Sequence, residues 1–131
     1  MGKRLNITSG APWEDIVGYS RAIRVGNTIE ISGTTAVNGE EIVGDSDLYL
    51  QTKFILQKIE TVLGQCGGQL KDVIRTRMFV TDISQWEQAA KAHSEVFGNI
   101  KPVTTMVEVS KLIGPKLLIE IEATAIIQLD V

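Results

Sequence analysis

Two carboxylates near the C-terminus are spaced so that they could take part in one reaction. Glu120 and Glu122 stand in the otherwise apolar run of residues 117–125. Side chains alternate between the two faces of a strand, so both carboxylates point to the same face of a strand predicted there. Each needs water, a partner or a ligand, because burying an unpaired charge is costly. A carboxylate flanked by apolar residues also has a raised pKa, which suits proton transfer near neutral pH.

The other reactive or charged side chains fit structural roles at least as well. His93 is the only histidine and falls on the apolar side of a predicted helix, which is typical of a hydrogen-bonded core residue. Arg75 and Arg77 share one face of a predicted strand, where they could contact a phosphate, replace a missing cation or form salt bridges. Cys66 follows a helix C-terminus, where the helix dipole disfavours a thiolate. No residues have the spacing of a metal site or a nucleotide-binding loop, so we expect neither metal nor cofactor.

Strands and helices are predicted to alternate around these residues. Two short strands, residues 20–25 and 28–34, are separated by a Gly-Asn pair, which is the spacing of a tight hairpin. A helix follows, because apolar residues then recur at helical spacing. It is predicted to begin at a cap formed by Asp45 or Ser46 and to run to about Gln65, where two glycines stop it.

The second half of the chain is predicted to contain three strands and a second helix. A strand over residues 72–81 places Ile74 on the same face as Thr76 and Met78. The second helix begins at Ser84, which has capping-box spacing. Two strands, residues 101–109 and 117–125, finish the chain. The residues that the second helix is predicted to bury are Trp86, Ala89, Ala90, His93 and Phe97.

This order of elements predicts one domain that spans residues 1–131. Right-handed crossovers place both helices on one face of a single sheet. The last strand is apolar on both faces, so the other face of the sheet also needs a cover. Association with further copies of the chain is the simplest cover, and pockets often form at such subunit contacts.

Composition and charge exclude several classes of protein. The formal net charge of −3 gives the chain no general attraction for nucleic acid. A single cysteine excludes an internal disulfide and fits a reducing compartment. The N-terminus lacks the apolar stretch of a secretory signal, and no apolar run approaches the roughly 20 residues that span a bilayer. We expect a cytoplasmic protein without membrane or nucleic-acid partners.

Seven short segments, taken together in order and spacing, resemble the Rid/YjgF family, also described as L-PSP endoribonuclease-like. Its best-known members are the RidA enamine/imine deaminases. The resemblance covers almost the whole chain. The segments are Gly18-Tyr19-Ser20-Arg21-Ala22, Val25-Gly26-Asn27, Ile31-Ser32-Gly33, Asp72-Val73-Ile74, Phe79-Val80-Thr81-Asp82, Lys101-Pro102 and Ile119-Glu120-Ile121-Glu122-Ala123.

The resemblance implies an α+β, chorismate mutase-like (YjgF) fold. Such a fold has a single six-stranded, mainly antiparallel sheet with two helices on one face. It also implies a homotrimer with a central barrel and small-molecule pockets in the clefts between subunits. The partners would then be other copies of the chain and a small-molecule ligand.

The resemblance further implies which residues form the pocket. Glu120 corresponds to the glutamate that places the attacking water, and Tyr19 to a tyrosine that holds the substrate. Ser32 and Gly33 correspond to a backbone turn that helps to hold the substrate. Thr104 stands where the deaminases have an arginine in a Pro-Ala-Arg-Ser-Cys segment. The other residues expected at the pocket are Thr105 and Met106 on its floor and Trp86, which could close it or pack in the core.

Thr104 changes the expected chemistry, because the arginine of the deaminases grips the substrate carboxylate as a bidentate pair. Threonine offers one hydroxyl group and no charge. Losing the charged fork should weaken carboxylate capture by roughly 2–5 kcal/mol. The chain thus resembles a branch that lacks the catalytic arginine. Typical amino-acid-imine deaminase activity is not expected unless Arg75, Arg77 or an arginine from a neighbouring subunit replaces it.

Three functions are therefore considered. The preferred one is a trimer that binds, and hydrolyses or deaminates, a small imine, enamine or carbonyl compound with water placed by Glu120. The alternative is a non-catalytic ligand-binding or regulatory trimer. The third is an endoribonuclease-type translation inhibitor, against which the acidic charge and the lack of a basic patch with interleaved aromatic residues argue.

Overall fold

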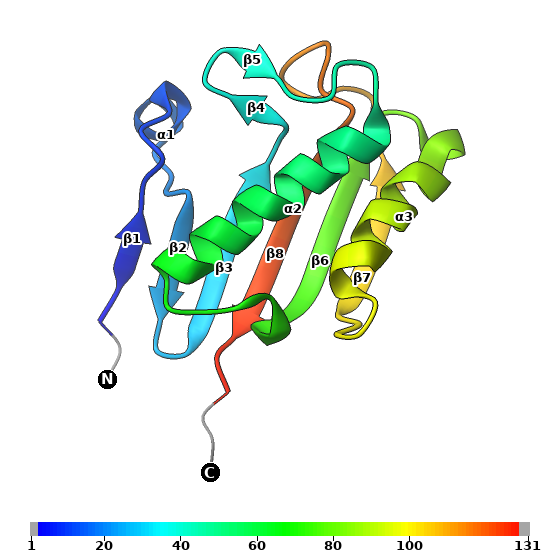
Figure 1. Cartoon of the computed structure of the whole chain (residues 1–131). Coiled ribbons are helices and arrows are strands. Elements are labelled where there is room, and N and C mark those ends of the chain that lie inside the picture. The colour runs from blue at the N-terminus through cyan, green and yellow to red at the C-terminus, as the bar shows by residue number, and fades with distance from the viewer. Residues whose placement is uncertain (1–2, 129–131) are drawn as a thin grey trace.

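The computed structural model describes residues 3–128 and contains one mixed sheet with two long helices packed across it (Figure 1). The helices are α1 (Pro12–Val17), α2 (Leu48–Gln65) and α3 (Trp86–Phe97). The strands are β1 (Leu5–Ile7), β2 (Ala22–Val25), β3 (Thr28–Thr34), β4 (Val37–Asn38), β5 (Glu41–Ile42), β6 (Val73–Val80), β7 (Val103–Glu108) and β8 (Ile119–Ile126).

The main sheet has the strand order β1-β2-β3-β8-β6-β7, and β4 and β5 form a separate small ribbon. Only the β6–β7 pair is parallel within the main sheet. The prediction of an α+β fold with six strands, mainly antiparallel, and two helices on one face is therefore confirmed. The last two strands of the chain are not neighbours, because β6 lies between them (Figure 1).

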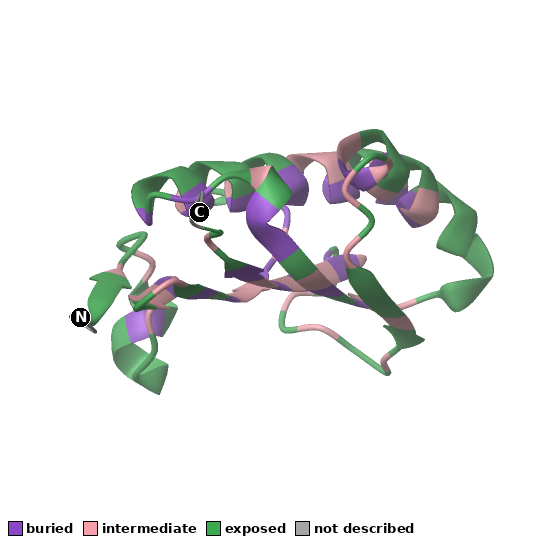
Figure 2. Cartoon of the chain, turned by 90° about the horizontal axis from the view of Figure 1, so that it is seen from below, coloured by how far each residue is buried: buried purple, intermediate pink, exposed green. Residues whose placement is uncertain are grey.

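The core lies between the helices and the sheet. In Figure 2 the buried residues of the long helices face those of the strands, while the opposite side of the sheet is largely uncovered. From α2 the core takes Ile55, Leu56, Ile59 and Leu63, and from β8 it takes Ile119, Ile121, Ala123 and Ala125. None of the helices in residues 3–128 is long and apolar enough to cross a membrane.

The predicted hairpin is confirmed, and the predicted first helix is confirmed with a different cap. Val25 of β2 pairs with Thr28 of β3 across the two-residue turn. The cap of α2 is Asp47, whose carboxylate accepts a hydrogen bond from the Leu50 amide at 2.9 Å. The prediction of Asp45 or Ser46 was therefore wrong. Asp45 instead forms an exposed ion pair, 3.3 Å long, with the Lys116 ammonium group.

The second helix begins two residues later than predicted. A 3-10 turn over Ile83–Gln85 precedes α3, and the Asp82 carboxylate caps that turn by accepting from the Ser84 amide at 3.0 Å. Trp86, predicted to be buried, is 51% exposed because it occupies the first position of the helix, beyond the edge of the core. The α3 residues that are buried are Ala89, Ala92 and Phe97.

Several short features were not predicted. The six-residue helix α1 lies on the side of the sheet opposite the long helices (Figure 2). Strand β1 pairs with β2 and forms one edge of the sheet. In β6 the pairing register shifts between Val73 and Arg75, which leaves Ile74 exposed. The prediction that Ile74 shares a face with Thr76 was wrong for this reason.

Replacing Asp47 with alanine is expected to lower the free energy of unfolding by about 1 kcal/mol, because the N-terminal amides of α2 lose their side-chain acceptor. Asp45→Ala is the matched control, since an exposed ion pair contributes about 0–1 kcal/mol. Urea unfolding measures both variants. Equal losses, or a larger loss in Asp45→Ala, would contradict the assignment of the cap.

Candidate functional site

The two carboxylates of β8 share one face of the strand, as predicted, and this is the open face of the sheet. Glu120 and Glu122 are half-buried, whereas Ile119 and Ile121, which alternate with them, are fully buried against the helices. Glu122 pairs across the strands with Arg77, at 3.5 Å between Oε1 and Nη1. Glu122 therefore forms an ion pair at the surface. Glu120 forms none with the described residues and is the carboxylate available to act on a ligand.

Glu120 lies directly against Gly33 of β3. A Cβ atom at position 33 would be 2.1 Å from Oε2 of Glu120, so only glycine leaves room for this carboxylate. Burial raises the pKa of Glu120, the charge of Glu122 raises it further, and the charge of Arg21 partly opposes both. The predicted direction of this pKa shift is confirmed. A carboxylate with a raised pKa exchanges protons closer to neutral pH.

Arg21 belongs to the same cluster, and the sequence interpretation did not single it out. Its Nη2 donates to the carbonyl oxygen of Gly33 at 2.5 Å, and its guanidinium carbon is 5.9 Å from the centre of the Tyr19 ring. Its Nε is buried and has no hydrogen-bond acceptor within residues 3–128. The hairpin register could have identified it, because pairing Ala22 with Ile31 places Arg21 opposite Ser32.

Tyr19 is positioned by the end of α1. The helix stops at Gly18, which has φ of 89°, and the amides of Gly18 and Tyr19 both donate to the carbonyl oxygen of Glu14. Burial alone would raise the pKa of Glu14, but hydrogen bonds from Ser9 and Thr8 to its carboxylate hold that pKa below its usual value. Glu14 therefore joins the segment before α1 to the turn that carries Tyr19.

A groove of about 590 Å³ runs along this part of the open face. Tyr19, Ser32 and Glu122 line it together with α1, while Glu120 and Gly33 do not. The Ser32 hydroxyl donates to the carbonyl oxygen of Ser20 at 2.6 Å, so its proton is not available to a ligand in the groove. The volume is in the range of small-molecule pockets.

The β7 residues predicted for the pocket lie elsewhere. Thr104 and Met106 pair in register with buried β6 residues and so face the long helices, whereas Thr105 faces the open side. β7 is two strands away from β8, or roughly 10 Å. One chain therefore does not bring Thr104 and Glu120 together. Trp86, at the start of α3, is likewise separate from Tyr19 and the groove residues.

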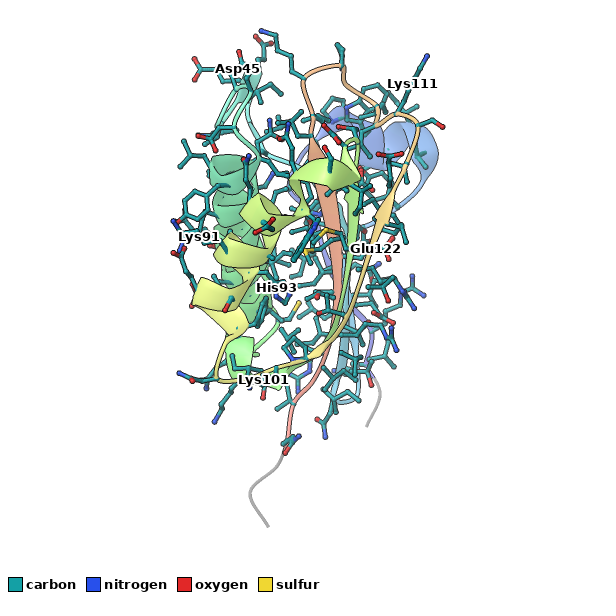
Figure 3. The ribbon with its side chains drawn as sticks, turned by 90° about the vertical axis from the view of Figure 1, so that its right-hand side faces the viewer. Asp45, Lys91, His93, Lys101, Lys111 and Glu122 are labelled. Carbon is teal, nitrogen blue, oxygen red and sulfur yellow. The ribbon has the colours of Figure 1, made fainter. Side chains whose placement is uncertain are left out.

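Thr104 instead ends a short hydrogen-bonded chain. Its hydroxyl oxygen is 2.6 Å from that of Thr76, which is 2.9 Å from Nε2 of His93. The His93 ring also packs on Phe97, with 4.8 Å between ring centres, and burial lowers the pKa of His93. His93 is hydrogen-bonded on the helix side of the sheet, as predicted, but it is only partly buried. Figure 3 shows His93 and Glu122 on opposite sides of the sheet.

The described residues contain no group of three or more histidine, cysteine or carboxylate side chains that could hold a metal. Cys66 is buried, and burial raises the pKa of its thiol against the opposing charge of Arg24. This agrees with the prediction that Cys66 is unreactive.

Comparison with known proteins gives consistent relatives. A family model described as Endoribonuclease L-PSP matches residues 9–127. The crystal structure of Rv2704 from Mycobacterium tuberculosis, a member of the YjgF/YER057c/UK114 family, has a TM-score of 0.88 and 47% sequence identity over 95% of this chain and 100% of that one. A RutC family protein of Pyrococcus abyssi is 38% identical over 95% of this chain and 98% of its own length. A protein of Acinetobacter baylyi named 3-aminoacrylate deaminase RutC is 29% identical, again over 95% of this chain and 98% of its own length.

Gly33→Ala is expected to lower the free energy of unfolding by roughly 1–3 kcal/mol, because the new methyl group overlaps the Glu120 carboxylate. Adding Glu120→Ala should recover most of this loss by removing the overlapping atoms. Gly64→Ala, in α2 with no atom near the added Cβ, is the control and should not destabilise the protein. Denaturant unfolding measures these variants. If Gly33→Ala destabilises the protein equally with and without the Glu120 side chain, the contact between Gly33 and Glu120 is contradicted.

The lowered pKa of His93 predicts a pH dependence of stability. The unfolded chain takes up a proton near pH 6.5 and the folded chain only at lower pH, so the free energy of unfolding falls as pH drops below about 6.5. In His93→Gln this fall should be missing. Glu120, with its raised pKa, stabilises the folded protein as pH falls, which is the opposite effect, but it does so equally in wild type and in His93→Gln. The difference in unfolding free energy between the two proteins therefore reports His93 alone. Urea unfolding of both proteins between pH 5 and 8 measures this. Curves of unfolding free energy against pH that run parallel would disprove the lowered pKa of His93.

Proposed function

Because the chain belongs to the endoribonuclease L-PSP family, whose members include YjgF and RutC proteins, we propose that it binds and hydrolyses a small imine, enamine or carbonyl compound. The observation that carries this proposal is the environment of the Glu120 carboxylate. Its carboxylate is half-buried over Gly33, has a raised pKa and has no ion-pair partner within residues 3–128. Such a carboxylate suits a general base better than a structural role.

In the proposed reaction Glu120 accepts a proton from water as the water oxygen attacks the imine carbon. Glu120 then returns this proton to the nitrogen, which gives a carbinolamine. Glu120 next takes the proton of the carbinolamine hydroxyl and passes it to the nitrogen as the C–N bond breaks, so that a carbonyl compound and ammonia leave. No oxidant or cofactor is needed. The name of the Acinetobacter relative, 3-aminoacrylate deaminase, supports this class, because 3-aminoacrylate is an enamine.

A second copy of the chain completes the proposed pocket. Glu120 and Thr104 are too far apart in one chain to hold one small ligand, so contact with both requires two subunits. Exposed apolar side chains lie at opposite ends of the sheet, with Ile16 (73% exposed) on α1 and Val103 (56%) on β7. Contacts between unlike surfaces form a ring when the rotation closes, and a homotrimer is one such ring. The buried, unpaired Cys66 fits the proposed cytoplasmic location.

The proposed substrates are neutral or weakly acidic compounds. Thr104 brings no charge to the pocket, and its hydroxyl is already engaged by Thr76. Amino-acid imines, which carry a carboxylate, should therefore have kcat/KM values at least roughly 30-fold below those that the same pocket would give with an arginine at position 104.

The test compares imines generated by an amino-acid oxidase with neutral analogues. Wild-type protein should favour the neutral imines, and Thr104→Arg should raise the rate on carboxylated ones. Glu120→Gln should lower kcat by about 10²–10⁴-fold, because the general base is lost. Glu60→Gln, at an exposed position of α2 away from the groove, is the control and should keep most of the activity.

Each alternative has its own outcome in the same experiment. Efficient turnover of carboxylated imines by wild-type protein would contradict the assigned effect of Thr104. Ligand binding that Glu120→Ala abolishes, with no substrate ever hydrolysed, would replace the enzyme with a ligand-binding trimer. A molar mass other than three chains in light scattering would contradict the trimer.

A further inference from the structure

Arg21 connects several residues of the candidate site, although it does not line the groove. It immediately precedes β2, where Ser32 of the neighbouring strand donates its amide to the Arg21 carbonyl oxygen at 3.0 Å. This pairing fixes the Arg21 backbone beside the Ser32-Gly33 turn. The side chain then reaches the Gly33 carbonyl oxygen and lies over the Tyr19 ring.

The Gly33 residue is in contact with both Arg21 and Glu120. The guanidinium group holds its carbonyl oxygen, and the Glu120 carboxylate occupies the space that a side chain at Gly33 would need. The pairing between β3 and β8 is irregular at this turn, so the regular ladder does not fix the peptide by itself. The hydrogen bond from Arg21 adds a restraint on this peptide, and the Glu120 carboxylate packs against the same glycine.

No nitrogen of Arg21 lies within 4.0 Å of a carboxylate oxygen in residues 3–128. Arg21 therefore forms no ion pair with Glu120, although its charge lowers the pKa of that carboxyl. The buried Nε, which lacks an acceptor, costs stability. A cation retained at such a cost is typical of a functional site.

The other charged groups around Glu120 do not replace this cation. Glu122 on the same strand adds a negative charge, and Arg77 of β6 is bonded to Glu122. Lys58 of α2 donates to the carbonyl oxygens of Thr35 and Val37. Glu14 of α1 is held by Thr8 and Ser9.

We propose that Arg21 is a positioning residue for Glu120: its hydrogen bond fixes the Gly33 peptide on which the carboxylate rests and places a cation at that peptide. The inference depends on Glu120 being the base of the proposed function. Arg21 thereby offsets the burial of Glu120 and its repulsion by Glu122.

The test follows the Glu120 carboxyl carbon by NMR in protein with ¹³C-labelled glutamate, with Glu120→Gln to assign the signal. In Arg21→Gln, which can still donate to the Gly33 carbonyl, the titration midpoint of Glu120 should move to higher pH. Arg21→Lys should keep it near the wild-type value. Arg24→Gln is the matched control, since Arg24 donates to the carbonyl oxygens of Gly26 and Cys66 and should not move the midpoint.

Two further measurements keep the inference testable. In unmutated protein the Arg21 Nε–H signal should shift with the same midpoint as Glu120, so a failure of Arg21→Gln to fold would not prevent the test. Where an imine is hydrolysed, the acidic limb of the kcat/KM profile should move with the NMR midpoint. An Arg21→Gln midpoint equal to that of Arg24→Gln, or an Arg21 signal that ignores Glu120, would overturn the inference. Because the NMR titration needs no substrate, loss of the proposed enzyme activity would not affect it.

Discussion

Strict alternation of side chains along β8 supports both the core and the candidate site. The strand pairs with β3 on one side and β6 on the other, and Ile119 and Ile121 fill the space below the helices. Glu120 and Glu122 consequently lie on the open face. A slip of one residue would turn both carboxylates into the core, so the burial of the isoleucines also fixes where the charges stand.

Features encoded by local patterns were predictable, and those set by distant contacts were not. The hairpin and the extent of α2 follow from spacing and turn residues, and the family follows from the order of short segments. The choice of Asp47 over Asp45 as cap depends on which residue has extended backbone next to the helix. Trp86 has the spacing of a buried residue, but it lies where α3 extends beyond the sheet.

The candidate site shows the same division. Both the shared face of the β8 carboxylates and the raised pKa of Glu120 could be predicted from alternation and apolar neighbours. The contact between Glu120 and Gly33 could not, because it requires β8 to pair with β3, far earlier in the chain. The sequence likewise does not reveal that Thr104 faces the helices, since that depends on the parallel register of β7 with β6.

The close approach of Gly33 and Glu120 also limits how this family member can evolve. Any side chain gained at position 33 meets the carboxylate of position 120, whereas shortening position 120 creates no overlap. The two positions are therefore not free to drift separately. A side chain gained at position 33 displaces the Glu120 carboxylate from its present place, so selection for that place of the acid also acts on the glycine.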